Sequence, residues 1–484
     1  MIEAGLLLPG AHRAAALADD RAVARAILRV EDAWVTAQSR TGLVPAAAAE
    51  AAHAAVDRVP LDEASLTELA VASEGGGNPV IPLLAAYRRV VEEEHGRPLG
   101  AVHAGLTSQD VMDTTLALVV EDVRGTVLDG LDRTGDALAG LAVRHRDTVM
   151  VGRTLTQHAL PVSFGLKAAS WLAGVDDAAD DVAARAHLPV SFGGAAGTLA
   201  ATVARCTHPG DSGQRAWQRV RELLGHWAEE LGLELPDGVW HTNRVPVLRA
   251  AGSLAETTAA LSRMANDVLT MSRPEVGELR EPAAEGRGVS SAMPQKQNPV
   301  LSVLLKRTGI AAPALLAQVV AGASAADDER PDGGWHAEWP ALRELAVLTA
   351  AASSHAAELA EGLTVGEERM TRNLADAGTG VMAERLNTAL APVLGERDGR
   401  SAKQRIQAAV RAEPQDPDAL AAALAAEVRT GEDVELPEGV AASELTGWIR
   451  GLLDPRGYLG AAPQLCERAA ARHDERKRRW PFPN

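Results

Sequence analysis

Apolar residues recur at every third or fourth position along most of the 484-residue chain, and they seldom alternate with polar residues as they would in a strand. Aromatic residues make up only 3% of the chain, whereas Ala, Leu, Arg and Glu are abundant. One apolar series consists of Leu254, Leu261, Met264, Val268 and Met271. This spacing places the side chains on one face of a long helix. The pattern therefore predicts an all-α protein in which long helices pack through apolar faces.

A second apolar series follows Thr107, and Asp110 stands three residues later, where a capping-box partner is expected. The series continues through Val111, Leu116, Val119, Val123 and Val127. Both series are interpreted as core-facing surfaces of helices. No cofactor role is assigned to the methionines.

Glycine, proline and charge patterns predict three helical domains. The domains are an N-terminal one at 1–105, a central long-helix bundle at 106–363 containing a loop at 277–299, and a C-terminal one at 364–484. A Gly-Gly-Gly-Asn-Pro turn at 75–79 interrupts the first domain. In the last domain, the Pro-, Asp- and Glu-rich stretch 413–439 is predicted to form connecting loops.

Charge and cysteine content restrict the possible partners. The formal net charge is -17, which argues against nucleic acid or an acidic membrane surface as a partner. No signal peptide and no uninterrupted apolar stretch of membrane-spanning length is recognised, so a cytoplasmic location is expected. Cys206 and Cys466 are far apart and lack neighbours at metal-ligand spacing, so neither disulfides nor a metal site are predicted.

The segment 286–299 reads Gly-Arg-Gly-Val-Ser-Ser-Ala-Met-Pro-Gln-Lys-Gln-Asn-Pro and is the strongest candidate for chemistry. Its glycines allow a loop that opens and closes over a site. Asn298 and Pro299 are predicted to be the N-cap and first residue of a helix. The alternative is an ordinary polar surface loop before that helix.

This segment resembles the signature loop of the fumarase/aspartase superfamily, Gly-Ser-Ser-x-Met-Pro-x-Lys-x-Asn-Pro. The resemblance implies that Ser290 removes a proton from a carbon beside a substrate carboxylate, that Lys296 binds the substrate and that Asn298 supports it. Two residues depart from the pattern. Val289 replaces the usual glycine, and Gln297 replaces an arginine common in the cycloisomerase and adenylosuccinate lyase branches.

Thr107 and Ser108 are predicted to lie at a helix N-terminus, where free amides and the helix dipole attract carboxylates. The resemblance assigns them to substrate binding. A plain capped helix start is the alternative.

The segment 151–161 also resembles a region of the superfamily and offers Arg153, Thr154 and Gln157 for substrate binding. Leu155 stands where fumarases and argininosuccinate lyases have a histidine. His158, interpreted as a residue on a helix, is a candidate proton donor, because imidazole exchanges a proton near neutral pH. A structural role for His158 is the alternative.

Arg244, in the segment 240–244, and Arg330 complete the implied substrate-binding set. A guanidinium offers a planar, bidentate fit to a carboxylate. The residues alone predict that 335–339 is a loop entering a helix at Pro340, with His336 and Glu338 solvated. These two residues lack further spaced ligands, so no metal is predicted there.

The segments 192–198, 335–339 and 452–460 look most like bacterial 3-carboxy-cis,cis-muconate cycloisomerase. That resemblance implies a cofactor-independent enzyme that forms carboxymuconolactone through a carbanion beside a carboxylate, in the β-ketoadipate route of aromatic catabolism. It also implies a small polycarboxylate substrate. It further implies a homotetramer in which the central helices form one bundle and each active site is shared between subunits.

Two alternatives remain. Loss of a cation at Gln297 suits a substrate with fewer carboxylates, such as a succinate derivative from which a nitrosuccinate lyase or an adenylosuccinate lyase-like enzyme releases fumarate. The second alternative is a structural homologue that has kept the fold and lost activity.

Overall fold

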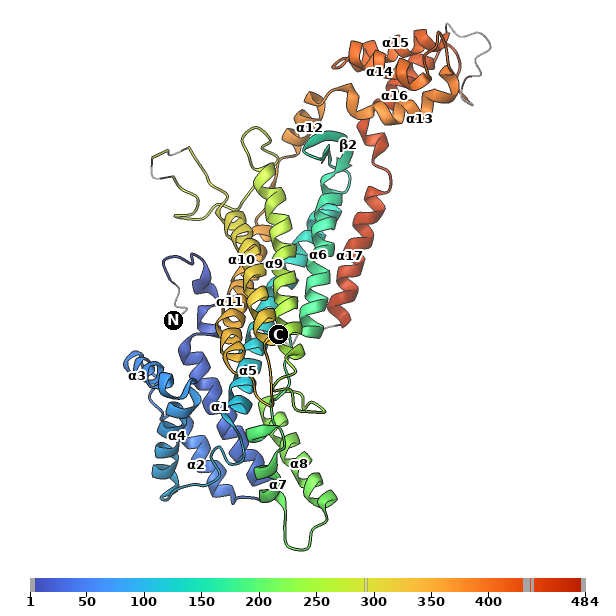
Figure 1. The fold of residues 1–484 in the computed structure, drawn as a ribbon. Helices are drawn as coiled ribbons and strands as arrows, with labels where there is room; N and C mark the ends of the chain where they lie inside the picture. The colour runs from blue at the N-terminus through green and yellow to red at the C-terminus, as the bar shows by residue number, and fades with distance from the viewer. Residues whose placement is uncertain (1–4, 291, 294, 430–435, 437–438, 480–484) are drawn as a thin grey trace. The chain divides into compact units, whose positions relative to one another are not determined.

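Helices dominate the computed structural model, which describes residues 5–290, 292–293, 295–429, 436 and 439–479, and they confirm the all-α class (Figure 1). The helices are α1 (Asp20–Arg40), α2 (Ala46–Val56), α3 (Glu63–Ser73), α4 (Val80–His95), α5 (Ser108–Arg144), α6 (Phe164–Arg185), α7 (Ala200–Cys206), α8 (Gly213–Leu231), α9 (Val245–Met271), α10 (Val300–Ser324), α11 (Gly333–Glu361), α12 (Glu367–Asp376), α13 (Ala383–Leu394), α14 (Ala402–Ala412), α15 (Pro417–Arg429), α16 (Leu445–Leu452) and α17 (Ala462–Arg479). The strands are β1 (Val149–Thr154), β2 (Gln157–Ser163), β3 (Leu279–Arg280) and β4 (Thr364–Val365).

The chain divides into two compact units, and each is assembled from three separate stretches of sequence. The first unit contains Met1–Asp132, Asp177–Ser262 and Val303–Ala357, and the second contains Arg133–Asp176, Arg263–Ser302 and Glu358–Asn484. Helices α5, α6, α9, α10 and α11 contribute residues to both units. The division into three domains at 105 and 363 remains a prediction.

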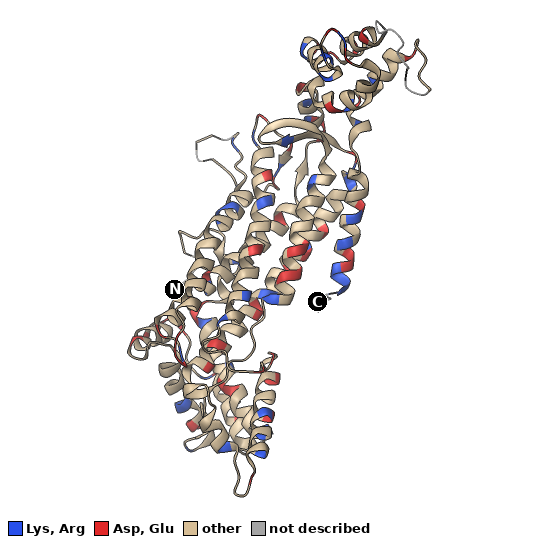
Figure 2. Cartoon of the chain, turned by 45° about the vertical axis from the view of Figure 1, so that its right-hand side comes forward, with Lys and Arg blue, Asp and Glu red and all other residues tan. Residues whose placement is uncertain are grey.

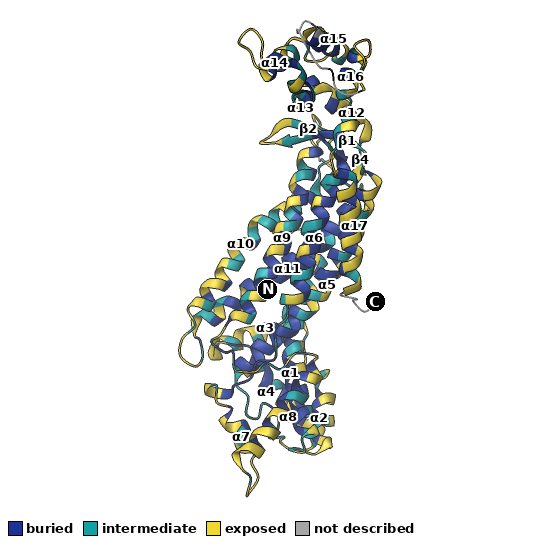
Figure 3. Cartoon of the chain, turned by 90° about the vertical axis from the view of Figure 1, so that its right-hand side faces the viewer, coloured by how far each residue is buried: buried dark blue, intermediate teal, exposed yellow. Residues whose placement is uncertain are grey.

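In the first unit, α1, α2, α4 and α8 surround an apolar core in which Trp34 and Trp227 meet edge to face, with ring centroids 5.1 Å apart. Both indoles and the Tyr87 hydroxyl donate to backbone carbonyls, so the large rings are buried without unpaired polar atoms. Buried positions follow the faces through which helices meet, and exposed positions follow the opposite faces (Figure 3). This is the arrangement predicted by the three- and four-residue periodicity.

Small residues allow close helix packing in the first unit. A Cβ atom at Gly130 of α5 would lie 2.7 Å from the Ser353 side chain of α11. No side chain fits at such a distance. Gly130 therefore sets how closely these two helices approach.

The second unit contains a hairpin of β1 and β2, paired antiparallel, where the sequence was interpreted as helical. Leu155 and Thr156 form its tip with φ angles of 48° and 69°. Two-residue hairpin turns in which both residues have a positive φ angle usually carry Asn or Gly. The sequence signal was therefore weak, and the placement of His158 on a helix was wrong.

Two other boundary predictions were wrong. Helix α15 occupies 417–429 of the stretch 413–439, which was predicted as loops, and its alanines and leucines pack into the apolar core of α13 to α16. Residues 430–435 and 437–438 of the same stretch lie outside the described residues. Helix α11 begins at Gly333, so Pro340 lies inside the helix rather than at its start. The helical conformation extends seven residues N-terminal to Pro340, which the proline signal alone did not indicate.

Among the described helices, α10 is long and apolar enough to cross a membrane by length and composition, with 28% of its most apolar window buried. Its exposed apolar side chains include Val303, Ile310 and Val320. Such a surface is also what an interface between helices requires.

Basic residues lie along the last turns of α17 (Figure 2), and two of them, the buried Arg476 and the exposed Lys477, join the buried His473 in a cluster with acidic residues of the second unit. The His473 ring lies between Asp176 of α6, 2.7 Å from Nδ1, and Asp136 of α5, 3.1 Å from Nε2. Arg476 also donates to Asp176, and Lys477 donates to Asp136. Both imidazole nitrogens face oxygen acceptors, so the doubly protonated ring fits best.

Burial disfavours charge on His473, but the hydrogen bonds and charges of Asp176 and Asp136 outweigh it and raise the pKa of His473 above its ordinary value. A raised folded-state pKa gives stability that is complete below the unfolded-state pKa and lost as pH rises through the folded-state pKa. We therefore predict that the thermal midpoint falls between about pH 6 and about pH 9 more in the wild type than in His473→Gln. The partly exposed His95→Gln should keep the wild-type slope, and equal slopes in all three proteins would contradict the prediction.

Candidate active site

The helix N-terminus predicted at Thr107 and Ser108 is present at the start of α5, and carboxylate binding there stays a prediction. Helix α5 begins at Ser108, and the Thr107 amide donates to Asp110 Oδ2 at 2.9 Å, as in one half of a capping box. Arg330 donates to the Thr107 hydroxyl at 2.8 Å and to Gln109 Oε1 at 3.4 Å. The structure thus brings Thr107, Ser108 and Arg330 together, although Arg330 is more than two hundred residues away in sequence.

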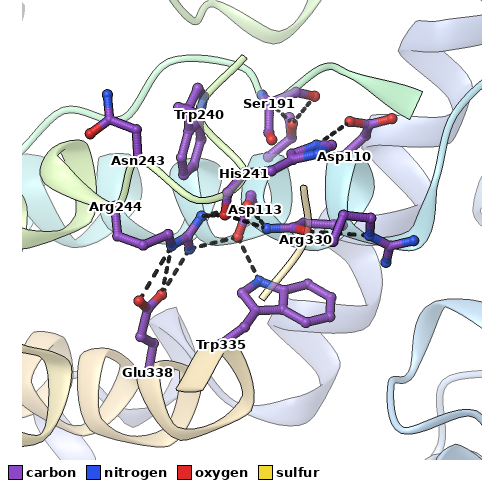
Figure 4. A network of polar contacts seen from close by, with 12 residues as sticks. Asp110, Asp113, Ser191, Trp240, His241, Asn243, Arg244, Arg330, Trp335 and Glu338 are labelled. Atoms are coloured by element: carbon purple, nitrogen blue, oxygen red, sulfur yellow. Dashed lines mark hydrogen bonds and ion pairs between the residues drawn. The ribbon is translucent and has the colours of Figure 1, made fainter. Parts of the chain in front are cut away.

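Sequence reasoning missed a buried pair beside this helix start. His241 Nε2 lies 2.7 Å from Asp110 Oδ1, and both side chains are almost fully buried (Figure 4). The Gly194 amide donates to Asp110 Oδ2 at 3.1 Å. The only sequence signal was that His241 lies in the segment 240–244, which had already been singled out for Arg244.

Arg244, predicted to bind substrate, lies in a buried ion cluster (Figure 4). Its guanidinium donates to both oxygens of Asp113 at 2.8 and 2.9 Å and to Glu338 Oε2 at 2.8 and 3.0 Å. Its side chain is 1% exposed, and the ring of Trp240 lies 4.9 Å from its Cζ. The geometry therefore suits a positioning role, because few donors remain for a ligand.

Glu338 was predicted to be solvated, and that prediction was wrong. The residue lies within α11 and is buried against Arg244. The Trp335 indole donates to Asp113 at 2.9 Å. Burial opposes charge on Arg244, but Asp113 and Glu338 outweigh it and hold the pKa of Arg244 above its ordinary value.

In the second unit, Arg153 at the end of the hairpin is also paired. It donates to both oxygens of Glu278 at 2.9 and 2.7 Å, and Asn373 donates to the same carboxylate at 2.8 Å. Glu278 is fully buried. The remaining predicted residues of the hairpin, Thr154, Gln157 and His158, are exposed. Arg153 therefore anchors the hairpin, while these polar groups project from it.

The signature loop is closed at its base by its two unusual residues. Val289 and Gln297 pair in an isolated antiparallel bridge. The Gln297 amide donates to the Arg287 carbonyl at 2.9 Å, and Asn298 donates to the Gly288 carbonyl through its side chain at 3.1 Å. A side chain at Gly288, where φ is 71°, would meet the Asn298 backbone.

Within this loop, the Ser290 hydroxyl accepts from the Met293 amide at 3.2 Å. Lys296 is exposed, and no carboxylate pairs with it among the residues that the structure describes. Ser291 and Pro294 of the signature lie outside the described residues.

The start of α10 differs from the prediction. The helix begins at Val300, and the Glu281 carboxylate accepts from the Leu301 and Ser302 amides at 2.9 and 2.7 Å. Asn298 is therefore not the N-cap. Its side chain closes the signature loop instead.

The predicted site residues fall into two groups. Those in the first unit are Thr107, Ser108, Arg244 and Arg330, and those in the second unit are Arg153, Thr154, Gln157, His158, Ser290, Lys296 and Asn298. The described part of the chain holds no cluster of three or more His, Cys, Asp or Glu residues suited to a metal ion.

Comparison with known proteins shows the family to which the chain belongs. A family model described as Lyase matches residues 14–312, which is more than half of the chain. The chain belongs to the fumarase/aspartase superfamily. It is therefore an enzyme of that superfamily.

The relatives include a nitrosuccinate lyase and 3-carboxy-cis,cis-muconate cycloisomerases. A nitrosuccinate lyase of Streptomyces davaonensis is 41% identical over 98% of this chain and 96% of its own. A 3-carboxy-cis,cis-muconate cycloisomerase of Bradyrhizobium diazoefficiens is 38% identical over 96% of each chain. The crystal structure of 3-carboxy-cis,cis-muconate lactonizing enzyme from Pseudomonas putida matches with a TM-score of 0.79 and 31% identity, covering 95% of this chain and 96% of that one.

The buried cluster around Arg244 predicts a large loss of stability in Arg244→Met. The substitution leaves the Asp113 and Glu338 carboxylates facing each other without a cation, which costs about 3 to 5 kcal/mol. Denaturant unfolding followed by circular dichroism measures the change. The matched control is Arg185→Met, which breaks the partly exposed pairs with Asp181 and Glu256 and should cost under about 1 kcal/mol. Similar losses in the two variants would contradict the structural importance of the buried cluster.

Proposed function

We propose that this enzyme eliminates a leaving group from a succinate derivative to give fumarate, and that nitrosuccinate is such a substrate, with nitrite as the second product. The proposal rests on how many cationic side chains among the predicted site residues are not already paired with a carboxylate of the protein, because these can bind a substrate carboxylate. Arg153 and Arg244 are saturated by buried carboxylates. Lys296 and Arg330 have no carboxylate partner among the described residues. Two cations match the two carboxylates of a succinate.

The signature loop supports the same substrate class. Gln297 replaces a cation of the cycloisomerase branch, and its amide is occupied by the Arg287 carbonyl. Arg287 itself pairs with Glu358. Lys296 is therefore the loop's unpaired cation among the described residues, whereas 3-carboxymuconate brings three carboxylates. The relative named nitrosuccinate lyase, at 41% identity, agrees with the smaller number of charges.

The proposed reaction starts with removal of a proton from C3 by Ser290, and the electron pair moves toward the C4 carboxylate. The pair then returns to form the C2–C3 double bond of fumarate as the bond between C2 and the nitro nitrogen breaks and its electrons leave with nitrite. A serine hydroxyl is a poor base, and the hydrogen bond from the Met293 amide favours its ionised form. The cations and the amides at the start of α5 stabilise the charge on the carboxylates.

The residue at the tip of the hairpin also agrees with nitrite as the leaving group. Nitrite is a weak base and departs without protonation, so the reaction needs no strong general acid. Leu155, 96% exposed, stands where fumarases and argininosuccinate lyases carry a histidine. An elimination that requires no proton donor tolerates that replacement.

Lactonisation of 3-carboxy-cis,cis-muconate is the second candidate. It is favoured by the relative at 38% identity and by the exposed His158, because ring closure ends with protonation of carbon. The substrate would then be a tricarboxylate. Its third carboxylate would need a cation from elsewhere in the assembly.

The proposed enzyme is a cytoplasmic homotetramer that needs no cofactor, membrane or nucleic acid. The exposed apolar side chains of α10, among them Ile310 at 70%, support assembly with other copies. Shared active sites would let the two groups of site residues come from different subunits.

We predict that the purified enzyme turns over nitrosuccinate faster than 3-carboxy-cis,cis-muconate, adenylosuccinate or argininosuccinate. Fumarate formation is followed by ultraviolet absorbance and nitrite by a colorimetric assay. Equal amounts of fumarate and nitrite are expected. Faster loss of 3-carboxymuconate with formation of a lactone would instead favour the cycloisomerase.

We predict that Ser290→Ala lowers kcat by about 100- to 10,000-fold, because the variant lacks the proposed base. The matched control is Ser401→Ala, at the start of α14, which should retain the wild-type kcat. If the wild type turns over no substrate of the panel faster than Ser290→Ala, the protein is the inactive structural homologue instead.

A further inference from the structure

The negatively charged Asp110 lies at the N-terminus of α5, and a helix N-terminus attracts anions. Asp110 belongs to the first turn of α5, where the free amides and the Thr107 and Ser108 hydroxyls are proposed to hold a substrate carboxylate. An unshielded carboxylate at this position would repel that ligand. The Asp110 side chain is fully buried, so bulk water does not screen it.

Three donors from three different segments face this carboxylate. His241 lies 2.7 Å from Oδ1, and the amides of Thr107 and Gly194 lie 2.9 and 3.1 Å from Oδ2. An ionised carboxylate only accepts, so His241 Nε2 carries the proton in this contact. These three hydrogen bonds partly neutralise the negative charge of Asp110, so it repels an anion at the free amides of α5 less strongly.

The position of the His241 ring is fixed from both sides. A Cβ atom at Gly193 would lie 2.7 Å from the ring Cε1, so a larger residue there would push the imidazole away. The Gln109 side chain donates to the His241 carbonyl at 2.9 Å. Gln109 also accepts from Arg330, which links the histidine to the proposed carboxylate site.

The loop 190–194 is held by α5 and by the segment 240–244, which contains His241. The Ser191 amide donates to the Thr114 hydroxyl of α5 at 2.9 Å, and the Trp240 indole donates to the Val190 carbonyl at 3.0 Å. The loop, the segment containing His241 and the start of α5 therefore form one interlocked unit (Figure 4). Asp110 is its common acceptor.

We propose that His241 and Asp110 are positioning residues that shield and orient the carboxylate-binding start of α5 and so set the affinity for a substrate carboxylate. This inference rests on the proposed function, because it needs Thr107, Ser108 and Arg330 to bind a carboxylate. It assigns neither residue to proton transfer with the substrate. Loss of the His241 donor exposes the charge of Asp110 and weakens binding, while the base in the signature loop is untouched.

The test compares His241→Leu, which donates nothing, with His241→Gln, whose amide restores a donor. We expect His241→Leu to raise KM by about 10-fold or more, the effect of losing a hydrogen bond to a charged group, with kcat within about threefold of the wild type. His241→Gln should restore most of the affinity. Gly193→Ala, which displaces the ring without removing it, should raise KM in the same way and serves if His241→Leu does not fold.

Affinity for fumarate, measured by calorimetry in the Ser290→Ala background, provides a readout independent of turnover. Weaker fumarate binding in His241→Leu with recovery in His241→Gln supports the inference, even if the wild type turns over no substrate of the panel. Unchanged binding in His241→Leu overturns it. Equal losses of binding and thermal midpoint in the Leu and Gln variants also overturn it, because they indicate packing alone. A protein that binds no fumarate before any change at His241 overturns it as well.

Discussion

The guanidinium of Arg244, buried between Asp113 and Glu338, is the interaction on which the site geometry depends. It joins α5, α11 and the residue immediately before α9, although these lie far apart in sequence. Bringing three charges out of water opposes folding, and apolar residues of the same volume would often be at least as stable. The cluster therefore contributes one defined arrangement of these helices rather than stability alone. The start of α5 and the position of Arg330 follow from that arrangement.

The two departures from the superfamily's signature prove to be a single structural feature, because Val289 and Gln297 pair with each other across the base of the loop. A β-branched residue suits such a bridge better than glycine does. The glutamine side chain adds a further bond to the Arg287 carbonyl. Replacement of a cation at this position thus stiffens the base of the loop and also changes the charge presented to a ligand. These two effects arise from the same pair of residues.

Local patterns predicted the features that depend on neighbouring residues. The periodicity of α5 and α9 and the bond from the Thr107 amide to Asp110 follow from residues within a few turns of one another. The partnership of His241 with Asp110 spans 131 positions, and no spacing rule indicates it. The hairpin around Leu155 was missed because its tip lacks the usual glycine or asparagine. Glu281, rather than the expected Asn298, accepts from the first amides of α10. Glu281 lies outside the signature motif, so the motif alone did not indicate this role.

The close approach of α5 and α11 at Gly130 has a consequence for how the sequence can diverge. Exchanges among Leu, Ile and Met at apolar core positions of these helices nearly conserve volume and polarity, so we expect them to cost little stability. Substitution of Gly130 differs, because even a methyl group there would lie 2.7 Å from Ser353. Relatives with a larger residue at this position must change the helix spacing, because the backbone carbonyl carbon of Ser353 would also lie only 2.8 Å away. Divergence at this crossing therefore requires a shift of one helix against the other, whereas the surrounding core can change one residue at a time.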